Sequence, residues 1–235
     1  MKGAFRKPGN YQNSDEYLWI MKIEGIKNRR IDHIVYAVFD LDKSMDDFEE
    51  LLGVRPIFGG YHKTFGTKNA LINLDKGVYL ELLAADNSNM DVQKPRWMGV
   101  DVLKEEQITR WALKSDKLEN DSRELKKYNP KMGQIAKGSR NTATGSLLRW
   151  ELTMPLSLLE VELVPFMLDW GQSEIHPHEA LPKMGCELVQ LYGTHPDPEL
   201  YTGILSALGL SFRIEKASEI RLKMLLKSPK GNIEL

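Results

Sequence analysis

The clearest alternation of apolar and polar positions lies in residues 31–85. An apolar, β-branched run at residues 31–38 predicts a buried strand. A helix follows, with Asp40 or Asp42 as its N-cap and Gly53 just after its end. The helix is marked by apolar residues at helical spacing, namely Met45, Phe48, Leu51 and Leu52. Three more strands, at residues 54–58, 68–74 and 78–83, complete a βαβββ unit.

Two weaker copies of this order of elements follow along the chain. We expect a second βαβββ-like module at residues 108–172 and a loop with a third, shorter module at residues 173–235. The first module then covers residues 29–86, and polar residues 87–107 read as a connector rather than a core element. The predicted fold is α+β, with repeated βαβββ modules forming curved mixed sheets.

Alignment of the third module with the first sets Gly209 over Gly53 at the two helix ends. It places Val189 opposite His33, and Glu234 resembles Glu81 in its sequence context. Such modules form a curved sheet in pairs, so a chain with three modules has one module without a partner. Either one module stands alone, or it pairs with the same module of a second subunit, which would make the protein a homodimer.

Composition narrows the classes of protein. The 235 residues carry a net charge of −1, which argues against nucleic acid or an anionic membrane as the main partner. The single cysteine, Cys186, excludes an internal disulfide and a thiolate-rich zinc site, so a reducing cytoplasmic compartment is expected. No apolar run is long enough to span a membrane, and residues 1–28 read as a poorly ordered leader.

His33 in the first strand and Glu81 in the last strand of the first module are candidate metal ligands. An imidazole and a carboxylate suit a divalent first-row metal, and the two would converge if their strands lie side by side. Each also has a simpler interpretation, His33 as a hydrogen-bonded core residue and Glu81 as a solvent-facing one. Glu81 is in addition a candidate catalytic base.

Other candidates surround these two. His62 follows a Gly-Gly turn, so it is either a third metal ligand or an exposed turn residue. Asn69 opens a strand, where an amide either binds substrate or closes a turn. Asp169 ends an apolar strand, so it is either a catalytic counterpart of Glu81 or a turn cap. Arg149 in a central strand would hold a substrate carboxylate or form an ion pair near Glu151.

His176 and His178 flank Pro177 in an extended segment, so both could approach one ion or one anionic substrate. For His176 the solvated loop is the favoured interpretation, whereas His178 is kept as a candidate substrate contact. His195 is most simply part of a capping turn.

Together the segments IDHIVYAVFDLDKSMDDFEELLGVRP, GGYHKTFGTKNALINL and YLELLA resemble the glyoxalase-like family of the vicinal oxygen chelate superfamily. The downstream segments LLRWELTMP, VPFMLDWG, PHEA and LVQLYGTHPDPE resemble later landmarks of that family, so the likeness covers roughly residues 31–210. The resemblance implies a divalent metal (Zn, Ni, Mn or Fe) in a cup of paired modules. His33 and Glu81 match its first-strand and fourth-strand ligands, but Arg110 or Trp111 stands where the second module should supply a ligand.

These observations predict a metal-dependent enzyme of the lyase, isomerase or dioxygenase type, similar to lactoylglutathione lyase or a dioxygenase, acting on a small oxygen-rich molecule. The alternative is a non-catalytic small-ligand-binding protein of the same fold. A third class, an assembly module that uses the unpaired unit as an interface, is less favoured.

Overall fold

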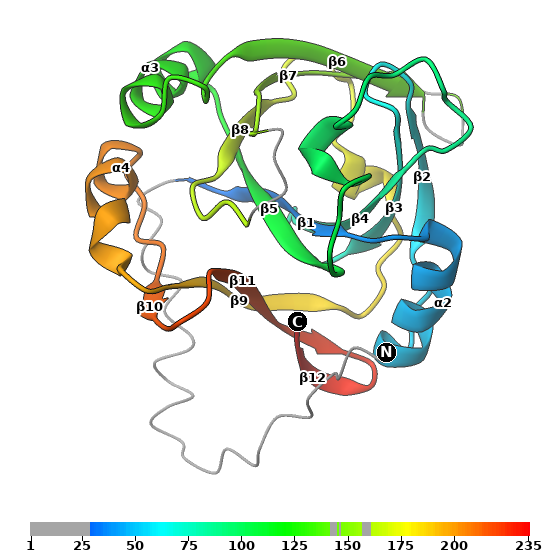
Figure 1. The fold of residues 1–235 in the computed structure, drawn as a ribbon. Coiled ribbons are helices and arrows are strands. Elements are labelled where there is room, and N and C mark those ends of the chain that lie inside the picture. Colours follow the sequence, from blue (N-terminus) through cyan, green and yellow to red (C-terminus); the bar gives the residue numbers. More distant parts are fainter. Residues whose placement is uncertain (1–28, 142–144, 146, 157–160) are drawn as a thin grey trace.

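The computed structural model describes residues 29–141, 145, 147–156 and 161–235, so the predicted leader lies outside the described residues. Two modules join in one curved eight-stranded sheet with the strand order β2-β3-β4-β1-β5-β8-β7-β6. The strands wrap around an interior, as Figure 1 shows. This mixed, curved sheet confirms the predicted fold class.

The first module contains one helix and four strands: β1 (Ile31–Ala37), α2 (Leu41–Leu52), β2 (Ile57–His62), β3 (Thr67–Asn73) and β4 (Tyr79–Ala85). The Asp40 side chain caps α2 by accepting the backbone N–H groups of Asp42 and Lys43. Gly53 ends the helix with φ of 79°, a left-handed conformation that costs glycine little. β1 pairs in parallel with β4, so the first and last strands of the module are neighbours.

The second module has the same order: β5 (Gln107–Lys114), α3 (Leu118–Tyr128), β6 (Ile135–Asn141), β7 (Leu147–Thr153) and β8 (Phe166–Asp169). Antiparallel pairing of β1 with β5 joins the two modules. At the opposite edges of the sheet, β2 and β6 approach each other, because Arg140 of β6 donates a hydrogen bond to the carbonyl of Gly59 in β2. The sheet therefore comes close to closing on itself.

The third module forms a separate four-stranded sheet. Its elements are β9 (Glu187–His195), η3 (Pro198–Tyr201), α4 (Thr202–Ala207), β10 (Ile214–Lys216), β11 (Arg221–Ser228) and β12 (Gly231–Glu234). The strand order is β10-β9-β11-β12, so β9 pairs with β10 and β11 rather than with the last strand. The strand of Glu234, β12, therefore pairs with β11, whereas the strand of Glu81, β4, pairs with the first strand of its module. Glu234 instead accepts a hydrogen bond from Tyr192 near the surface.

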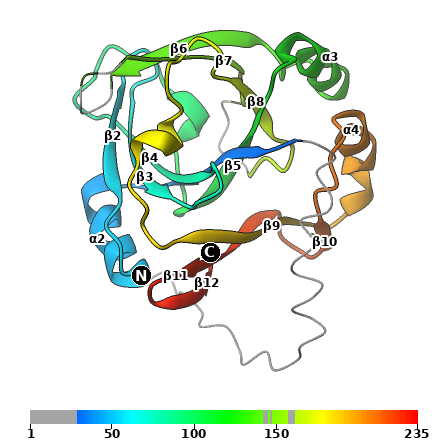
Figure 2. The ribbon, with the colours of Figure 1, turned by 180° about the vertical axis from the view of Figure 1, so that it is seen from behind.

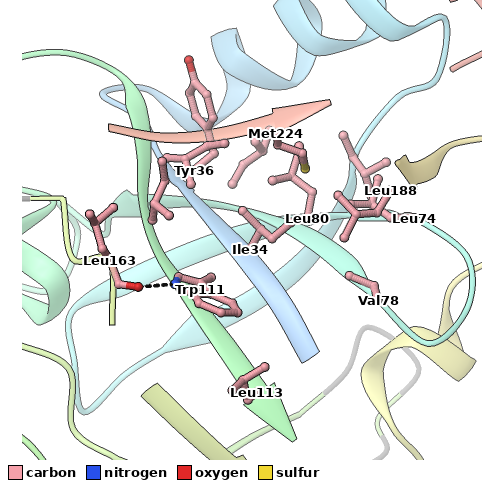
Figure 3. Packing of buried hydrophobic residues seen from close by; sticks show 14 of the residues in the cluster. Ile34, Tyr36, Leu74, Val78, Leu80, Trp111, Leu113, Leu163, Leu188 and Met224 are labelled. Atoms are coloured by element: carbon pink, nitrogen blue, oxygen red, sulfur yellow. Dashed lines mark hydrogen bonds between the residues drawn. The ribbon is translucent and has the colours of Figure 1, made fainter. Parts of the chain in front are cut away.

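The third sheet lies against the outer face of the large sheet. Figure 2 shows β9 and β11 running beneath the ring of strands. In Figure 3, Leu188 of β9 and Met224 of β11 lie close to Leu80 of β4, and all three belong to one hydrophobic core. Burial of such side chains contributes roughly 1.5–3 kcal/mol each. The third module is thus packed against the first two within the same chain.

A second core fills the inner face of the large sheet. The connector after β4 turns inward through a short helix, η1 (Trp97–Gly99), which lies inside the ring in Figure 1. Met98 is fully buried and Val100 is 3% exposed, in contact with apolar residues of the strands. The expectation that residues 87–107 form no part of the core is therefore wrong. Isolated apolar residues in a polar segment gave no periodic signal that would have shown it.

Among the described residues, no helix is long and apolar enough to cross a membrane.

Candidate functional site

His33 of β1 and Glu81 of β4 face each other on the inner side of the sheet. The parallel register sets Val35 opposite Glu81, and His33 lies on the same face of β1 as Val35 because strand residues two apart share a face. His33 Nε2 lies 3.4 Å from Glu81 Oε2. The two residues are 4% and 3% exposed, so the pair is shielded from solvent.

Asp32 anchors the other side of the His33 ring. Its Oδ1 lies 2.7 Å from His33 Nδ1, and its Oδ2 accepts the indole N–H of Trp170 at 2.9 Å. Burial alone would raise the pKa of Asp32, but hydrogen bonds from His176 and His33 outweigh it and hold that pKa well below its usual range. Asp32 is therefore an ionised acceptor, and His33 donates through Nδ1. Nε2 is then the ring nitrogen that faces Glu81, and in the neutral imidazole it carries the lone pair that can bind a metal.

His176 supplies the third donor to Asp32. Its Nε2 lies 2.8 Å from Asp32 Oδ2, and its Nδ1 accepts the backbone N–H of His178 at 3.1 Å. Because Nδ1 accepts, Nε2 carries the proton that His176 donates to Asp32. His176 also caps η2 (Pro177–Ala180). The solvated loop favoured for His176 from sequence is therefore wrong.

Asn69 of β3 holds Glu81 in place. Its side-chain amide donates to Glu81 Oε1 at 2.6 Å, which leaves Oε2 for His33. Asn69 Oδ1 is buried with no hydrogen-bond partner among the described residues. We call the connected set Trp170, His176, Asp32, His33, Glu81 and Asn69 the buried polar chain.

Tyr79 covers the His33 ring. The two rings stack with centroids 4.8 Å apart and an interplanar angle of 16°. Burial, helped by the charge of Asp32, raises the pKa of Tyr79 well above its usual value, so its phenol stays protonated at neutral pH.

His62 lies near the pair but has a different environment. Its Nδ1 lies 3.0 Å from the Thr67 hydroxyl, and its ring packs edge-on against Trp97 and Trp150. Burial lowers the pKa of His62 to about 4, although the charge of Glu81 acts in the opposite direction. His62 is therefore neutral at physiological pH, and the alternative of an exposed turn histidine does not fit its 5% exposure.

Among its described residues, the second module presents no matching ligands to the interior. Ala112 of β5 lies opposite His33, and Phe166 and Leu168 of β8 belong to the inner core. Arg110 is buried and donates to the carbonyls of Thr109 and Leu156, whereas Trp111 packs in the outer core. The candidate site is consequently built mainly from the first module.

Two predicted residues lie apart from the pair. Asp169 directly follows the inward-facing Leu168, and its Oδ1 accepts the backbone N–H of Gly171 at 2.7 Å, which is the turn-cap interpretation. His178 accepts the backbone N–H of Gly77 through Nε2 at 3.2 Å, so it joins its loop to the β3–β4 turn.

Arg149 of β7 is exposed and lines a cavity of about 230 Å³ where β2 and β6 approach each other. We call this the rim cavity. His62, Lys63, Thr64, Phe65, Lys137, Gly138, Ser139, Arg149, Trp150 and Gln172 line it.

The suitability of the pair for a divalent metal can be tested on its geometry. Two ligand atoms at about 2.0–2.2 Å from one tetrahedral metal lie about 3.3–3.5 Å from each other, and His33 Nε2 and Glu81 Oε2 meet this condition at 3.4 Å. The carboxylate on His33 Nδ1 is the usual support of a metal-binding histidine. Among the described residues, no group of three or more His, Cys, Asp or Glu is arranged to hold a metal. A metal here would have two such ligands.

Sequence reasoning missed Asp32 and Trp170. One signal for Asp32 was available, since an acid inside the apolar run of residues 31–38 must find donors when it is buried. Trp170 and His176 reach it from 138 and 144 positions away along the chain, which no local pattern reveals.

Comparison with known proteins supports the resemblance found in the sequence. The family model described as a glyoxalase-like domain matches residues 31–209. A hypothetical protein from Staphylococcus aureus has a similar fold, with a TM-score of 0.61 at 17% identity over 82% of this chain and 88% of that one. Methylmalonyl-CoA epimerase from Mycobacterium tuberculosis matches with a TM-score of 0.39 at 18% identity over 59% of this chain and 86% of that one. No curated protein matches the sequence.

Proposed function

The chain belongs to the glyoxalase-like domain family, and on that premise we propose that it is a metal-dependent enzyme of the lyase, isomerase or dioxygenase type acting on a small oxygen-rich molecule. One observation carries the proposal. His33 Nε2 and Glu81 Oε2 lie 3.4 Å apart, and Asp32 holds the other nitrogen of the imidazole. This arrangement supports a site for one divalent cation, Zn, Ni, Mn or Fe.

His33 and Glu81 would hold the metal, which when bound supplies a Lewis acid for a substrate oxygen. Asp32 keeps the lone pair of His33 Nε2 directed at the site. Asn69 fixes the carboxylate of Glu81 by donating to Oε1 at 2.6 Å, so one oxygen stays oriented while the other serves as ligand or base.

The surroundings of the pair exclude water. Phe166 packs edge-on against His33, and Tyr79 covers its face. Charged groups interact more strongly in such a dry environment, which favours both metal binding and proton transfer at Glu81. Asp169 and His178 have no part in this mechanism. The side chain of Asp169 caps a turn by accepting the backbone N–H of Gly171, and His178 accepts the backbone N–H of Gly77.

The test is the metal content of the purified full-length protein. We expect stoichiometric metal that is lost in the His33→Ala/Glu81→Ala double variant. The matched control is His195→Ala/Glu199→Ala, which removes the same two residue types from the end of β9 and from η3 and should keep the metal. A metal-free protein whose melting temperature does not change on metal addition would overturn the proposal.

A second candidate function is capture of a small ligand without catalysis. The apolar residues that the second module presents to the interior favour it, because Ala112, Phe166 and Leu168 supply no ligand atoms. The same metal measurement separates the two functions, since a ligand-binding protein would stay metal-free and fold normally. The homodimer expected from the module count stays a prediction.

A further inference from the structure

The rim cavity adjoins the buried polar chain, because Trp150 in its wall packs against Trp170 with ring centroids 5.4 Å apart. His62 lines it, and the charges of Glu81 and His33 both act on the pKa of His62. At about 230 Å³ the cavity is below the roughly 300–1,000 Å³ typical of sites for drug-sized ligands. Its size therefore suits a small molecule.

The charges on its wall have one sign. Lys63, Lys137 and Arg149 line the cavity, and no lining residue is an acid. Lys137 forms an ion pair with Glu151, in which Nζ lies 3.1 Å from Oε1. Within the described part of the chain, Lys63 and the Arg149 guanidinium form no ion pair. A protein with a net charge of −1 has no general excess of cations, so this grouping is local.

The floor of the cavity is rigid and aromatic. Trp150 is 5% exposed and lies directly over Gly138, where an added Cβ would come within 2.3 Å of the indole. Only glycine lets the two neighbouring strands β6 and β7 place the ring there. Lys137 and Arg149 are thus carried on strands of the sheet, and Lys63 lies in the short turn between β2 and β3.

We infer that the rim cavity binds the anionic group, a carboxylate or a phosphate, of the small molecule on which the protein acts. Lys63 and Arg149 would hold the oxyanion by charge-assisted hydrogen bonds, with Arg149 suited to a bidentate contact. His62, whose Nδ1 faces Thr67 and whose side chain lines the cavity, would contact the rest of the molecule. The inference rests on the proposed function and names its substrate class.

The experiment titrates the full-length protein with inorganic phosphate and, separately, with malonate by calorimetry at low ionic strength. A chelator is present, so metal plays no part. We expect saturable binding of at least one anion that weakens by about tenfold or more in Lys63→Met/Arg149→Met. The control Lys104→Met/Lys131→Met removes two exposed lysines that do not line the cavity and should bind like the unchanged protein.

Binding of phosphate alone or of malonate alone supports the inference and identifies the group. The absence of saturable binding of either anion, or an equal loss in both double variants, would overturn it. Metal content is measured on the same protein preparation before the chelator is added. A metal-free protein that still binds the anion contradicts only the metal-dependent function, whereas a metal-loaded protein without anion binding contradicts only this inference.

Discussion

Asp32 Oδ2 and His176 Nε2 lie 2.8 Å apart although 144 positions separate the two residues in the chain. The contact ties the first strand of the large sheet to the loop that leads into the third module. It gives a buried carboxylate a third donor, beside His33 and Trp170. The buried polar chain therefore joins the first module, Trp170 at the end of the second and the loop that leads into the third.

The variant Asp32→Asn tests this dependence. An amide has one acceptor oxygen and places an N–H group against donors, so the variant leaves buried donors unpaired. We expect a loss of roughly 3–5 kcal/mol in the free energy of unfolding, measured by urea denaturation. The control is Asp91→Asn on an exposed turn, which should change it by less than about 0.5 kcal/mol. Equal stability of the two variants would contradict the role of Asp32.

Variants of two tryptophans distinguish the effect of losing an indole hydrogen bond from the effect of losing ring volume. Trp170→Phe keeps most of the ring but removes the N–H that donates to Asp32 at 2.9 Å, so we expect a loss of about 1–2 kcal/mol. Trp97→Phe removes an indole N–H that is buried without a partner among the described residues, so it should be neutral or stabilising. Thermal unfolding of both variants checks the prediction. A larger loss for Trp97→Phe would show that ring volume, not the hydrogen bond, decides the effect.

Local sequence patterns account for most of the secondary-structure elements that were predicted correctly. The strand predicted at residues 31–38 is found at Ile31–Ala37, and the N-cap is Asp40, one of the two predicted alternatives. These signals and the helix end at Gly53 are local in the sequence. The partners of β9 were not predicted, since strand pairing depends on tertiary packing, and β10 has only three residues. His33 and Glu81 were found as a pair by their residue types. Their supports Asp32 and His176 were missed, because hydrogen bonds between distant segments leave no repeat in the sequence.

Two methionines of the connector at residues 87–107 differ in burial, so their variants test whether this segment belongs to the core. Met98 is fully buried in the inner core, whereas Met90 in the same connector is 82% exposed. Met98→Ala leaves a cavity and should lower the free energy of unfolding by roughly 2–5 kcal/mol, whereas Met90→Ala should change it by less than about 0.5 kcal/mol. Chemical denaturation of both variants is the measurement. Similar, small effects would mean that the connector is not part of the core.

His62 should make the protein sensitive to acid. Its pKa is lowered to about 4 by burial, below the value of about 6.5 for a free histidine, so the unfolded chain binds a proton first as the pH falls. Stability is therefore lost between about pH 6.5 and pH 4, by roughly 3 kcal/mol in total from this residue. His62→Gln should flatten the stability curve in that window, measured by urea denaturation at a series of pH values. The control His195→Gln makes the same substitution at the half-buried end of β9, outside the rim cavity. A His62→Gln curve as steep as that of the unchanged protein would assign the acid sensitivity to other groups.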